Sequence, residues 1–368
     1  MNRTPTYYRY EDFDDCGYYM RYSKRIKNIY WCVYDPQNIA KAVYLAEKGK
    51  VKRGEVKRFN ENLLDNMDDL WSMLKYETYE PGKYKSKTIH EPKERLIKIA
   101  PYFPDRIVHH CVINVCRDIW ETVFIDNTYS CIKGKGIHKC MEDVTKDMLE
   151  DWRGTRYCLK IDIKKFYDNI DHDVLKKIIR YKIGDEQLLR LLDKLIDSTG
   201  TDKGLPIGNY TSQYFANLYL SYFDHYMKEV IGVKYYYRYM DDIVILDGSK
   251  NRLHRVLEIM ALYLGAELKL EIKDNWQVFP VDSRPIDYVG YKMNHYNILL
   301  RKSILLNFYK KLNRTRDKYH IEDEDGIKHA YSSEYGWIIR CSDEHKDYLF
   351  NKIINFNQDE TKIELRSA

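Results

Sequence analysis

Residues 235–246 read YYYRYMDDIVIL, and this stretch decides how the rest of the chain is interpreted. Tyrosine, isoleucine and valine on both sides of Asp241-Asp242 favour two β-strands joined by a tight turn. Successive strand residues face opposite sides, so adjacent carboxylates can serve one site only from the turn. An aspartate pair also suits an ordinary polar turn. The apolar hairpin around it instead predicts a site, with Asp241 and Asp242 at the tip.

A third carboxylate ends a second predicted strand, YCLKID at residues 157–162. Alternation places Cys158, Lys160 and Asp162 on one face of this strand. If the strand and the hairpin are neighbours in one sheet, three acids meet. Clustered carboxylates repel one another unless cations neutralise them, and Mg²⁺ prefers oxygen ligands. Two Mg²⁺ ions at such a site can activate a 3′-hydroxyl and stabilise leaving pyrophosphate, which is the chemistry of nucleotidyl transfer.

The composition is that of a globular protein, with 368 residues, 44% hydrophobic content and a net charge of +5. The sequence contains no apolar run of membrane-spanning length and no apolar leader, so we expect no membrane association and a cytoplasmic protein. Eight cysteines without a CxxC pair fit a reduced compartment. Cys111 and Cys116 lie beside two histidines, so a zinc site is an alternative to the buried thiols that we expect.

The order of predicted elements indicates an α+β fold, with helices packed on a small antiparallel sheet. Helical patterns cover 105–124, 171–182, 186–197 and 211–230, and most of the chain after Arg301. A strand pair is predicted around Glu91-Pro92, and shorter strands within 269–280 and 285–293.

Residues 239–242, YMDD, resemble the active-site signature of reverse transcriptases. The resemblance covers roughly residues 36–320. It includes LKIDIKKFYDNIDH (159–172), HEPKERLI (90–97), GLPIGNYTSQYFANLYL (204–220) and IDYVGYK (286–292). It implies a right-hand polymerase fold with fingers, palm and a helical thumb. The implied divisions are an N-terminal extension (1–35), fingers (36–155), palm (156–295), and thumb with tail (296–368).

The resemblance also implies roles for the acids. Asp162 and Asp241 are the expected principal ligands of two Mg²⁺ ions, with Asp242 as the third acid. The backbone carbonyl of Ile163 is a further expected ligand. Asp168 and Asp171 follow closely, and we expect them to cap or pair with the next helix rather than to touch metal.

Contacts to the incoming deoxynucleotide are implied at several positions. Lys93 and Arg95 would clasp the triphosphate, against the alternative of a solvated basic face. Tyr167 would stack under the sugar and exclude a 2′-hydroxyl, while Phe166 competes for this role or packs in the core. Lys273 would donate a proton to pyrophosphate, with Lys269 as a competitor.

The loop at 204–213 carries the other expected nucleotide contacts. Gly208, like Gly204, would let the backbone approach the nucleotide, and Gln213 would position the loop. Basic residues at 131–139 and a basic helix at 301–320 would contact template or primer phosphates, unless these are ordinary solvated surfaces.

The form IGNYTSQ (207–213) departs from the QGxxxSP pattern of most bacterial relatives. Ile207 replaces glutamine, and Gln213 replaces proline. This form resembles the reverse transcriptases of diversity-generating retroelements. It implies copying of a template-repeat RNA with errors at template adenines, and a small basic accessory protein as partner. Ile207 offers only apolar contact, so we expect it to contribute to misincorporation.

Other readings stay open at the level of sequence. An antiphage reverse transcriptase is the main alternative, and a non-catalytic nucleic-acid-binding protein with this fold is another. A retron enzyme would carry a VTG-like motif where this chain has YVGYKMNHYN (288–297). A group II intron enzyme would carry a maturation region. The target gene, the template RNA and the priming site are not encoded in any motif.

Overall fold

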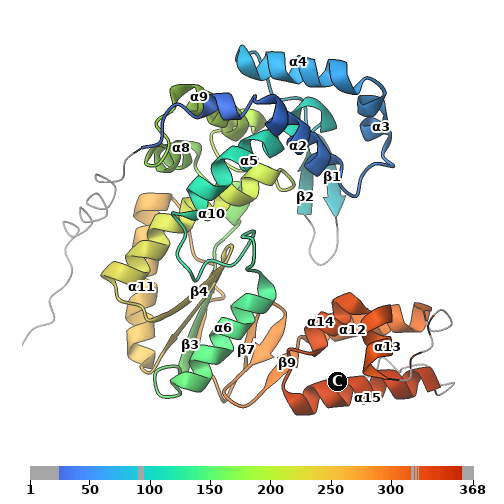
Figure 1. Ribbon diagram of the computed structural model, residues 1–368. Coiled ribbons are helices and arrows are strands. Elements are labelled where there is room, and N and C mark those ends of the chain that lie inside the picture. The colour runs from blue at the N-terminus through green and yellow to red at the C-terminus, as the bar shows by residue number, and fades with distance from the viewer. Residues whose placement is uncertain (1–24, 90–94, 316–318, 320, 322, 359–368) are drawn as a thin grey trace, which may run out of the picture. The chain divides into compact units, whose positions relative to one another are not determined.

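The computed structural model describes residues 25–89, 95–315, 319, 321 and 323–358 (Figure 1). The chain forms two compact units, each built from three segments. The first unit comprises Met1–Asp126, Ile163–Gly232 and Met260–Ile272. The second comprises Asn127–Asp162, Val233–Ile259 and Lys273–Ala368. Helix α11 (Lys250–Leu268) begins in the second unit and ends in the first.

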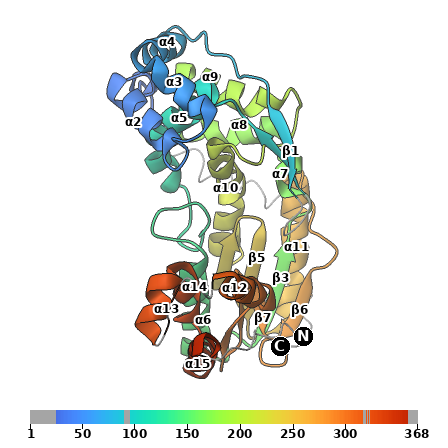
Figure 2. The same cartoon turned by 90° about the vertical axis from the view of Figure 1, so that its right-hand side faces the viewer.

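The first unit is mainly helical. Its elements are η2 (Tyr30–Cys32), α2 (Pro36–Glu47), α3 (Gly54–Glu61), α4 (Leu63–Lys75), β1 (Lys85–Ile89), β2 (Arg95–Ile99), η3 (Tyr102–Arg106), α5 (Ile107–Glu121), α7 (Phe166–Asn169), α8 (His172–Arg180), α9 (Glu186–Ile196), η4 (Asp197–Thr199), α10 (Tyr210–His225) and η5 (Tyr226–Val230). Figure 2 shows α2, α3 and α4 grouped beside α5. Strands β1 and β2 form an antiparallel pair with Lys85 opposite Ile99, as predicted.

Asp185 shows how one side chain organises part of this unit. Its carboxylate accepts hydrogen bonds from the backbone N–H groups of Gln187 and Leu188, which caps α9. It also accepts bonds of 2.7 and 2.9 Å from the N–H groups of Ile29 and Tyr30. The segment before α2 is therefore fixed to the start of α9.

The second unit contains the predicted sheet. Its elements are α6 (Ile137–Glu150), β3 (Tyr157–Asp162), β4 (Tyr235–Tyr239), β5 (Asp242–Asp247), β6 (Gln277–Pro280), β7 (Ile286–Tyr288), β8 (Tyr291–Met293), β9 (Ile298–Leu300), α12 (Lys302–Thr315), α13 (Glu324–Ala330), α14 (Ser332–Ile338) and α15 (Asp343–Gln358). Four strands form an antiparallel sheet in the order β4-β5-β3-β6, and β7-β8-β9 form a second sheet. The segment 286–292, predicted as one short strand, is a hairpin of β7 and β8.

One face of the four-stranded sheet is covered by a continuous apolar core. Cys158, Val244 and Leu246 from the sheet pack there with Val144 and Met148 of α6. Tyr288, Tyr291 and Met293 of the smaller sheet join the same core. Helix α12 buries Leu305, Phe308 and Leu312, as its apolar spacing predicted. This packing holds β3 and β5 rigidly on the side that ends in the acids.

Candidate active site

The hairpin of β4 and β5 differs from the prediction in one respect. Tyr239 pairs directly with Asp242, so the turn consists of Met240 and Asp241. Only Asp241 therefore lies at the tip, and Asp242 is the first residue of β5, which corrects the prediction that both acids occupy the turn. A two-residue connection is the shortest that joins antiparallel strands, and the alternating apolar residues fix its register.

Arg238 supports this turn from inside the protein. Its side chain is fully buried, and its guanidinium donates a 3.1 Å hydrogen bond to the carbonyl of Met240. Met240 has φ 59°, a left-handed conformation that is unfavourable for a residue with a side chain. The guanidinium thus holds the strained peptide that carries Asp241.

Strand pairing brings the third acid to the same place. Asp162, the last residue of β3, lies directly opposite Asp242 in the antiparallel ladder. Directly opposed strand residues have Cβ atoms about 5 Å apart. The sequence predicted a joint site only if residues 157–162 and the hairpin were neighbours in one sheet. The pairing of β3 with β5 meets this condition.

Two lysines face these carboxylates. The Lys273 ammonium lies 2.5 Å from Oδ1 of Asp162, and the Lys160 ammonium lies 3.5 Å from Oδ2 of Asp242. Lys160 also donates to the backbone carbonyl of Asp287. Lys269, the competitor of Lys273, instead pairs with Asp171, which caps α8. The geometry therefore brings Lys273, and not Lys269, to the acids.

Asp242 has an unusual electrostatic environment. Burial raises the pKa of its carboxyl to about 6; the Lys160 ammonium opposes the rise, and the charges of Asp162 and Asp241 add to it. Its Oδ1 atom is buried without a hydrogen-bond partner among the described residues. A buried carboxylate oxygen without a donor is costly. Such an atom indicates a position where a cation supplies the missing partner.

The residues fit a divalent metal by their donor chemistry, since carboxylate oxygens are the ligands that Mg²⁺ prefers. Across the part of the chain that the structure describes, no three His, Cys, Asp or Glu side chains are grouped as ligands. Instead, Asp162 and Asp242 face ammonium groups. Cys111 and Cys116 are buried free thiols.

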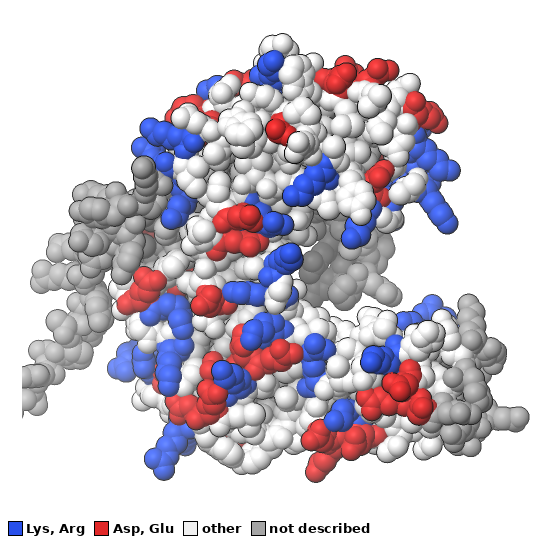
Figure 3. Space-filling view, in the orientation of Figure 1, with Lys and Arg blue, Asp and Glu red and all other residues white. Residues whose placement is uncertain are grey.

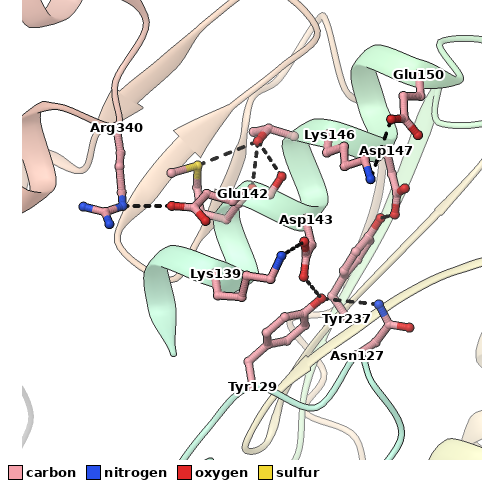
Figure 4. A network of polar contacts seen from close by, with 12 residues as sticks. Asn127, Tyr129, Lys139, Glu142, Asp143, Lys146, Asp147, Glu150, Tyr237 and Arg340 are labelled. Atoms are coloured by element: carbon pink, nitrogen blue, oxygen red, sulfur yellow. Dashed lines mark hydrogen bonds and ion pairs between the residues drawn. The ribbon is translucent and has the colours of Figure 1, made fainter. Parts of the chain in front are cut away.

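Helix α6 is bonded to β4 and to the segment before the helix through tyrosine hydroxyls that donate to carboxylates (Figure 4). Tyr237 donates to Asp147, and Tyr129 donates to Asp143 over 2.9 Å. Lys139 pairs with the same Asp143 over 2.6 Å. In the same apolar core, the buried Tyr288 hydroxyl donates to the carbonyl of Asp242 over 3.1 Å. These contacts fix both strands of the hairpin.

A cavity of about 260 Å³ adjoins the acids. Asp162 and Asp242 line it together with three cations, Lys160, Arg284 and Arg301. Arg301 is held by an ion pair of 2.6 Å with Asp287. A cavity with this lining can accept a phosphate beside a carboxylate-bound cation.

The predicted nucleotide contacts other than Lys273 belong to the first unit. Phe166 is buried, whereas Tyr167 is partly exposed at the start of α7. Ile207 is partly exposed and Gln213 is exposed on the first turn of α10. Gly208 has φ 123°, and a Cβ there would lie 3.1 Å from the carbonyl oxygen of Lys98 in β2. Glycine is therefore required where this loop passes the β1–β2 hairpin.

The remaining predicted contacts are Arg95, Lys93 and the backbone carbonyl of Ile163. Arg95 begins β2 opposite Ile89, and Lys93 lies outside the described residues. Ile163 follows Asp162 and forms a bridge with Ile272 in which Lys164 donates to the Glu271 carbonyl. The carbonyl of Ile163 is thus not an acceptor in this bridge.

Sequence reasoning assigned no role to Lys160 and Arg238. Lys160 shares a strand face with Asp162, so the alternation of residues along the strand could have predicted its position beside the acids. Arg238 lies among aromatic strand residues, where a buried guanidinium has no sequence signature. Its function became visible only through its bond to Met240.

Acids at the ends of adjacent antiparallel strands, on a sheet backed by helices, define a polymerase of the right-hand fold. The family described as "Reverse transcriptase (RNA-dependent DNA polymerase)" matches residues 86–293, more than half of the chain. The chain belongs to the reverse transcriptase family.

Two curated relatives match at low identity. The group II intron-encoded protein LtrA of Lactococcus lactis subsp. cremoris is 22% identical over 290 residues, which cover 59% of this chain and 48% of LtrA. Protein YkfC of Escherichia coli (strain K12) is 26% identical over 225 residues, covering 56% of this chain and 58% of YkfC. The chain thus spans about half the length of these curated relatives.

Among solved structures, telomerase from Candida tropicalis in complex with a TWJ fragment of telomeric RNA matches with a TM-score of 0.47 and 12% identity. The match covers 79% of this chain and 56% of that chain. No helix in the described part of the chain combines the length and apolarity needed to span a membrane.

Proposed function

We propose that this chain is an RNA-directed DNA polymerase that extends a primer with deoxynucleotides on an RNA template. The observation that carries the proposal is the direct cross-strand pair of Asp162 and Asp242, with Asp241 in the adjoining turn. The buried, unpartnered oxygen of Asp242 supports a cation at this point. Asp162, Asp241 and Asp242 would hold two Mg²⁺ ions, with the Ile163 carbonyl as a further ligand.

The chain's own residues would organise the reaction around these ions. The carboxylates of Asp162, Asp241 and Asp242 would hold Mg²⁺, which would supply activation of the primer hydroxyl and charge compensation for the leaving pyrophosphate. Arg238 and Tyr288 would keep the hairpin in place while substrates exchange. Lys273, next to Asp162, would be released from that carboxylate and would protonate the pyrophosphate. Lys160, Arg284 and Arg301 would contact strand phosphates in the adjoining cavity.

Primer extension tests this proposal. Purified protein, Mg²⁺, deoxynucleotides and a DNA primer on a defined RNA template should give full-length DNA. Asp241→Asn should reduce synthesis at least a thousandfold, because it removes a metal ligand, and Asp274→Asn, an exposed acid nearby in the same unit, should not. RNA binding without synthesis by the unsubstituted chain would instead favour a non-catalytic binding protein.

We further propose that the enzyme serves a diversity-generating retroelement. The support is the IGNYTSQ form at 207–213, which has an apolar Ile207 where most bacterial relatives have glutamine. The enzyme would copy a template-repeat RNA, misincorporate at template adenines and act with a small basic accessory protein. In the same proposal, residues 36–155 act as fingers, 156–295 as palm and 296–368 as thumb with tail. Lys93, Arg95, Tyr167, Gly208 and Gln213 would shape the nucleotide site.

Sequencing of the cDNA tests this subtype. Errors should concentrate at template adenines, and Ile207→Gln should lower that error frequency severalfold, because glutamine restores a polar contact that discriminates base pairs. The control for Ile207→Gln is Val51→Gln, because Val51 is exposed. Leu205→Gln would not serve, because Leu205 is buried. Faithful copying at all four bases would contradict the diversity-generating subtype and would leave the proposal of an RNA-directed DNA polymerase unaffected.

A further inference from the structure

The loop between η4 and α10 is tied to the strand pair β1–β2 by a chain of neutral side chains. Asn209 donates a 2.7 Å hydrogen bond from Nδ2 to the Tyr84 hydroxyl. The same hydroxyl lies 2.8 Å from Oγ of Ser198. Ser198 itself donates to the carbonyl of Leu195 over 2.7 Å, so the Tyr84 hydroxyl must donate to Ser198. The chain of hydrogen bonds therefore runs in one direction, from Asn209 through Tyr84 to the last turn of α9.

Asn209 occupies a position where its side chain would ordinarily serve the helix. It is the N-cap residue of α10, with φ −77° and ψ 139°, and asparagine at an N-cap commonly accepts a hydrogen bond from the first turn. Among the described residues, no such bond reaches its side chain. Asn209 is only 4% exposed, and its side chain is bonded to Tyr84 instead. An unused cap lowers the stability of the helix, which indicates that this side chain has another role.

A second contact with the strand pair lies one residue earlier in the loop. Gly208 has φ 123°, and a Cβ on it would lie 3.1 Å from the carbonyl oxygen of Lys98 in β2. Lys98 lies at the end of the pair where Lys85 begins β1, and Tyr84 directly precedes Lys85. The two contacts thus reach the same end of the strand pair. The ladder of backbone hydrogen bonds connects this end to Arg95, the first residue of β2.

The start of the loop is fixed to the segment that carries Tyr167. The N–H of Leu205 donates to the carbonyl of Tyr167 over 2.8 Å, and the N–H of Gly204 donates to the carbonyl of Ile170 over 2.8 Å. The loop is therefore anchored at both ends, and Ile207 lies between the two anchors.

We propose that Asn209, Tyr84 and Ser198 form a positioning chain that holds the loop against β1–β2 and thereby raises the affinity for the incoming deoxynucleotide. This role rests on the proposed function, in which Ile207 and Arg95 help to form the nucleotide site. The three residues are positioning residues, because they act through the loop and the strand. When the chain is broken, the loop and the strand pair hold their binding arrangement for a smaller fraction of the time, and the apparent affinity falls by that fraction.

The chain consists of uncharged groups, which distinguishes its effect from that of surface charges. Figure 3 shows Lys and Arg side chains mixed with Asp and Glu over the visible face of the molecule. Salt screens interactions between such exposed charges, with a Debye length of about 8 Å at physiological ionic strength. Hydrogen bonds between neutral, partly buried groups are screened far less. The contribution of the chain should therefore persist in concentrated KCl.

Single-nucleotide primer extension with the full chain tests the proposal. Tyr84→Phe removes both hydrogen bonds of the hydroxyl and should raise KM for the deoxynucleotide about fivefold to tenfold, with kcat changed less than about twofold. The rise in KM should be the same at low and at high KCl. Tyr44→Phe is the matched control, because Tyr44 is 62% exposed on α2, and it should leave KM and kcat unchanged.

Conservative variants separate positioning from packing. Asn209→Asp keeps an acceptor for the Tyr84 hydroxyl and should raise KM less than Asn209→Ala does. Ser198→Thr keeps the hydroxyl and should preserve KM, whereas Ser198→Ala should raise it. In the double variant Tyr84→Phe/Asn209→Ala, the rise in KM should be no larger than in Tyr84→Phe, because both substitutions remove the same bond.

An unchanged KM in Tyr84→Phe would overturn the proposal, and so would a lower melting temperature with KM and kcat both preserved. Either result would assign the chain to stability alone. Equal rises in KM for Tyr84→Phe and the Tyr44→Phe control would overturn it as well.

Hydrogen exchange of the backbone amides, measured on the same samples, requires no synthesis. Exchange at 204–213 and at 95–99 should be faster in Tyr84→Phe, and exchange at 137–150 in α6 should not change. Unchanged exchange at 204–213 would overturn the proposal. If the unsubstituted chain makes no DNA while exchange rises as expected, the polymerase proposal fails and the positioning of the loop by Tyr84 stands.

Discussion

At the scale of single residues, Asp242 illustrates a conflict between folding and function. The carboxyl is placed where burial and two neighbouring acids make its charge unfavourable, and only Lys160 opposes them. Its raised pKa means that the folded protein holds a proton there more tightly than the unfolded chain does. Folding is therefore favoured below the unfolded pKa, and this contribution is lost as the pH rises through about 6.

The expected consequence is that Asp242→Asn stabilises the metal-free protein while abolishing synthesis. The free energy of unfolding should rise by about 1–2 kcal/mol at pH 8, a value reduced for solvent screening. The gain should be smaller at pH 5, where the unsubstituted carboxyl is largely protonated. Urea unfolding in EDTA at the two pH values measures it, with Asp274→Asn as the exposed control. A loss of stability at pH 8 would contradict the argument.

Arg238 acts on the reaction through Met240 and Asp241, so it is a positioning residue. Arg238→Met keeps an unbranched side chain, shorter than arginine, and removes the donor to the Met240 carbonyl. We expect kcat for nucleotide addition to fall about tenfold to a hundredfold, because small displacements of reacting groups are costly. KM for the nucleotide should change much less. Arg238→Lys should recover part of kcat; equal losses in both variants, matched by loss of fold in circular dichroism, would indicate a merely structural role.

At the scale of elements, α6 and β4 are joined by two tyrosine hydroxyls that donate to acids spaced one turn apart. Tyr237 donates to Asp147 of α6, and Tyr235 donates to Asp151, the residue that follows the helix. Tyr129, in the segment before α6, donates to Asp143. Tyr235 and Tyr237 are two residues apart on one face of the strand, and their aspartates are four residues apart, so the two spacings match. The helix thereby fixes the strand that leads into the catalytic turn.

Removing the central bond tests this coupling. Tyr237→Phe leaves the Asp147 carboxylate without its donor and should cost about 1–3 kcal/mol of unfolding free energy. Tyr235→Phe should cost less, because Asp151 keeps hydrogen bonds from Gly154 and Lys234. Adding Asp147→Asn to Tyr237→Phe should recover part of the loss in a double-mutant cycle of thermal unfolding. Strictly additive losses would show that helix and strand are not coupled through this bond.

The elements also show what the sequence could predict. The hairpin, the strand at 157–162 and the helices followed from alternation and helical spacing. The joint position of the acids was conditional, because no local pattern states which strands pair. The register of Asp162 with Asp242 supplied that condition. Lys160 and Arg238 were not assigned because their roles depend on backbone carbonyls brought close by tertiary packing.

At the scale of the whole molecule, metal binding should be linked to global stability. A cation that binds only the folded protein adds RT ln(1 + [Mg²⁺]/Kd), about 2.7 kcal/mol at a hundred times Kd. Mg²⁺ should therefore raise the melting temperature of the unsubstituted chain, and EDTA should reverse the rise. Asp162→Asn should lose this response while its melting temperature in EDTA stays within a few degrees. An undiminished response in Asp162→Asn would place the metal elsewhere.

The path of the chain through its two units has a consequence for biosynthesis. Asp162 is the last residue of one segment of the second unit, and Lys273, its ion-pair partner, is the first residue of another. Neither unit is complete in the nascent chain until residues well past the middle have left the ribosome. A ribosome-bound chain that stops before residue 273 should therefore lack the lysine that faces Asp162 and should show no working centre.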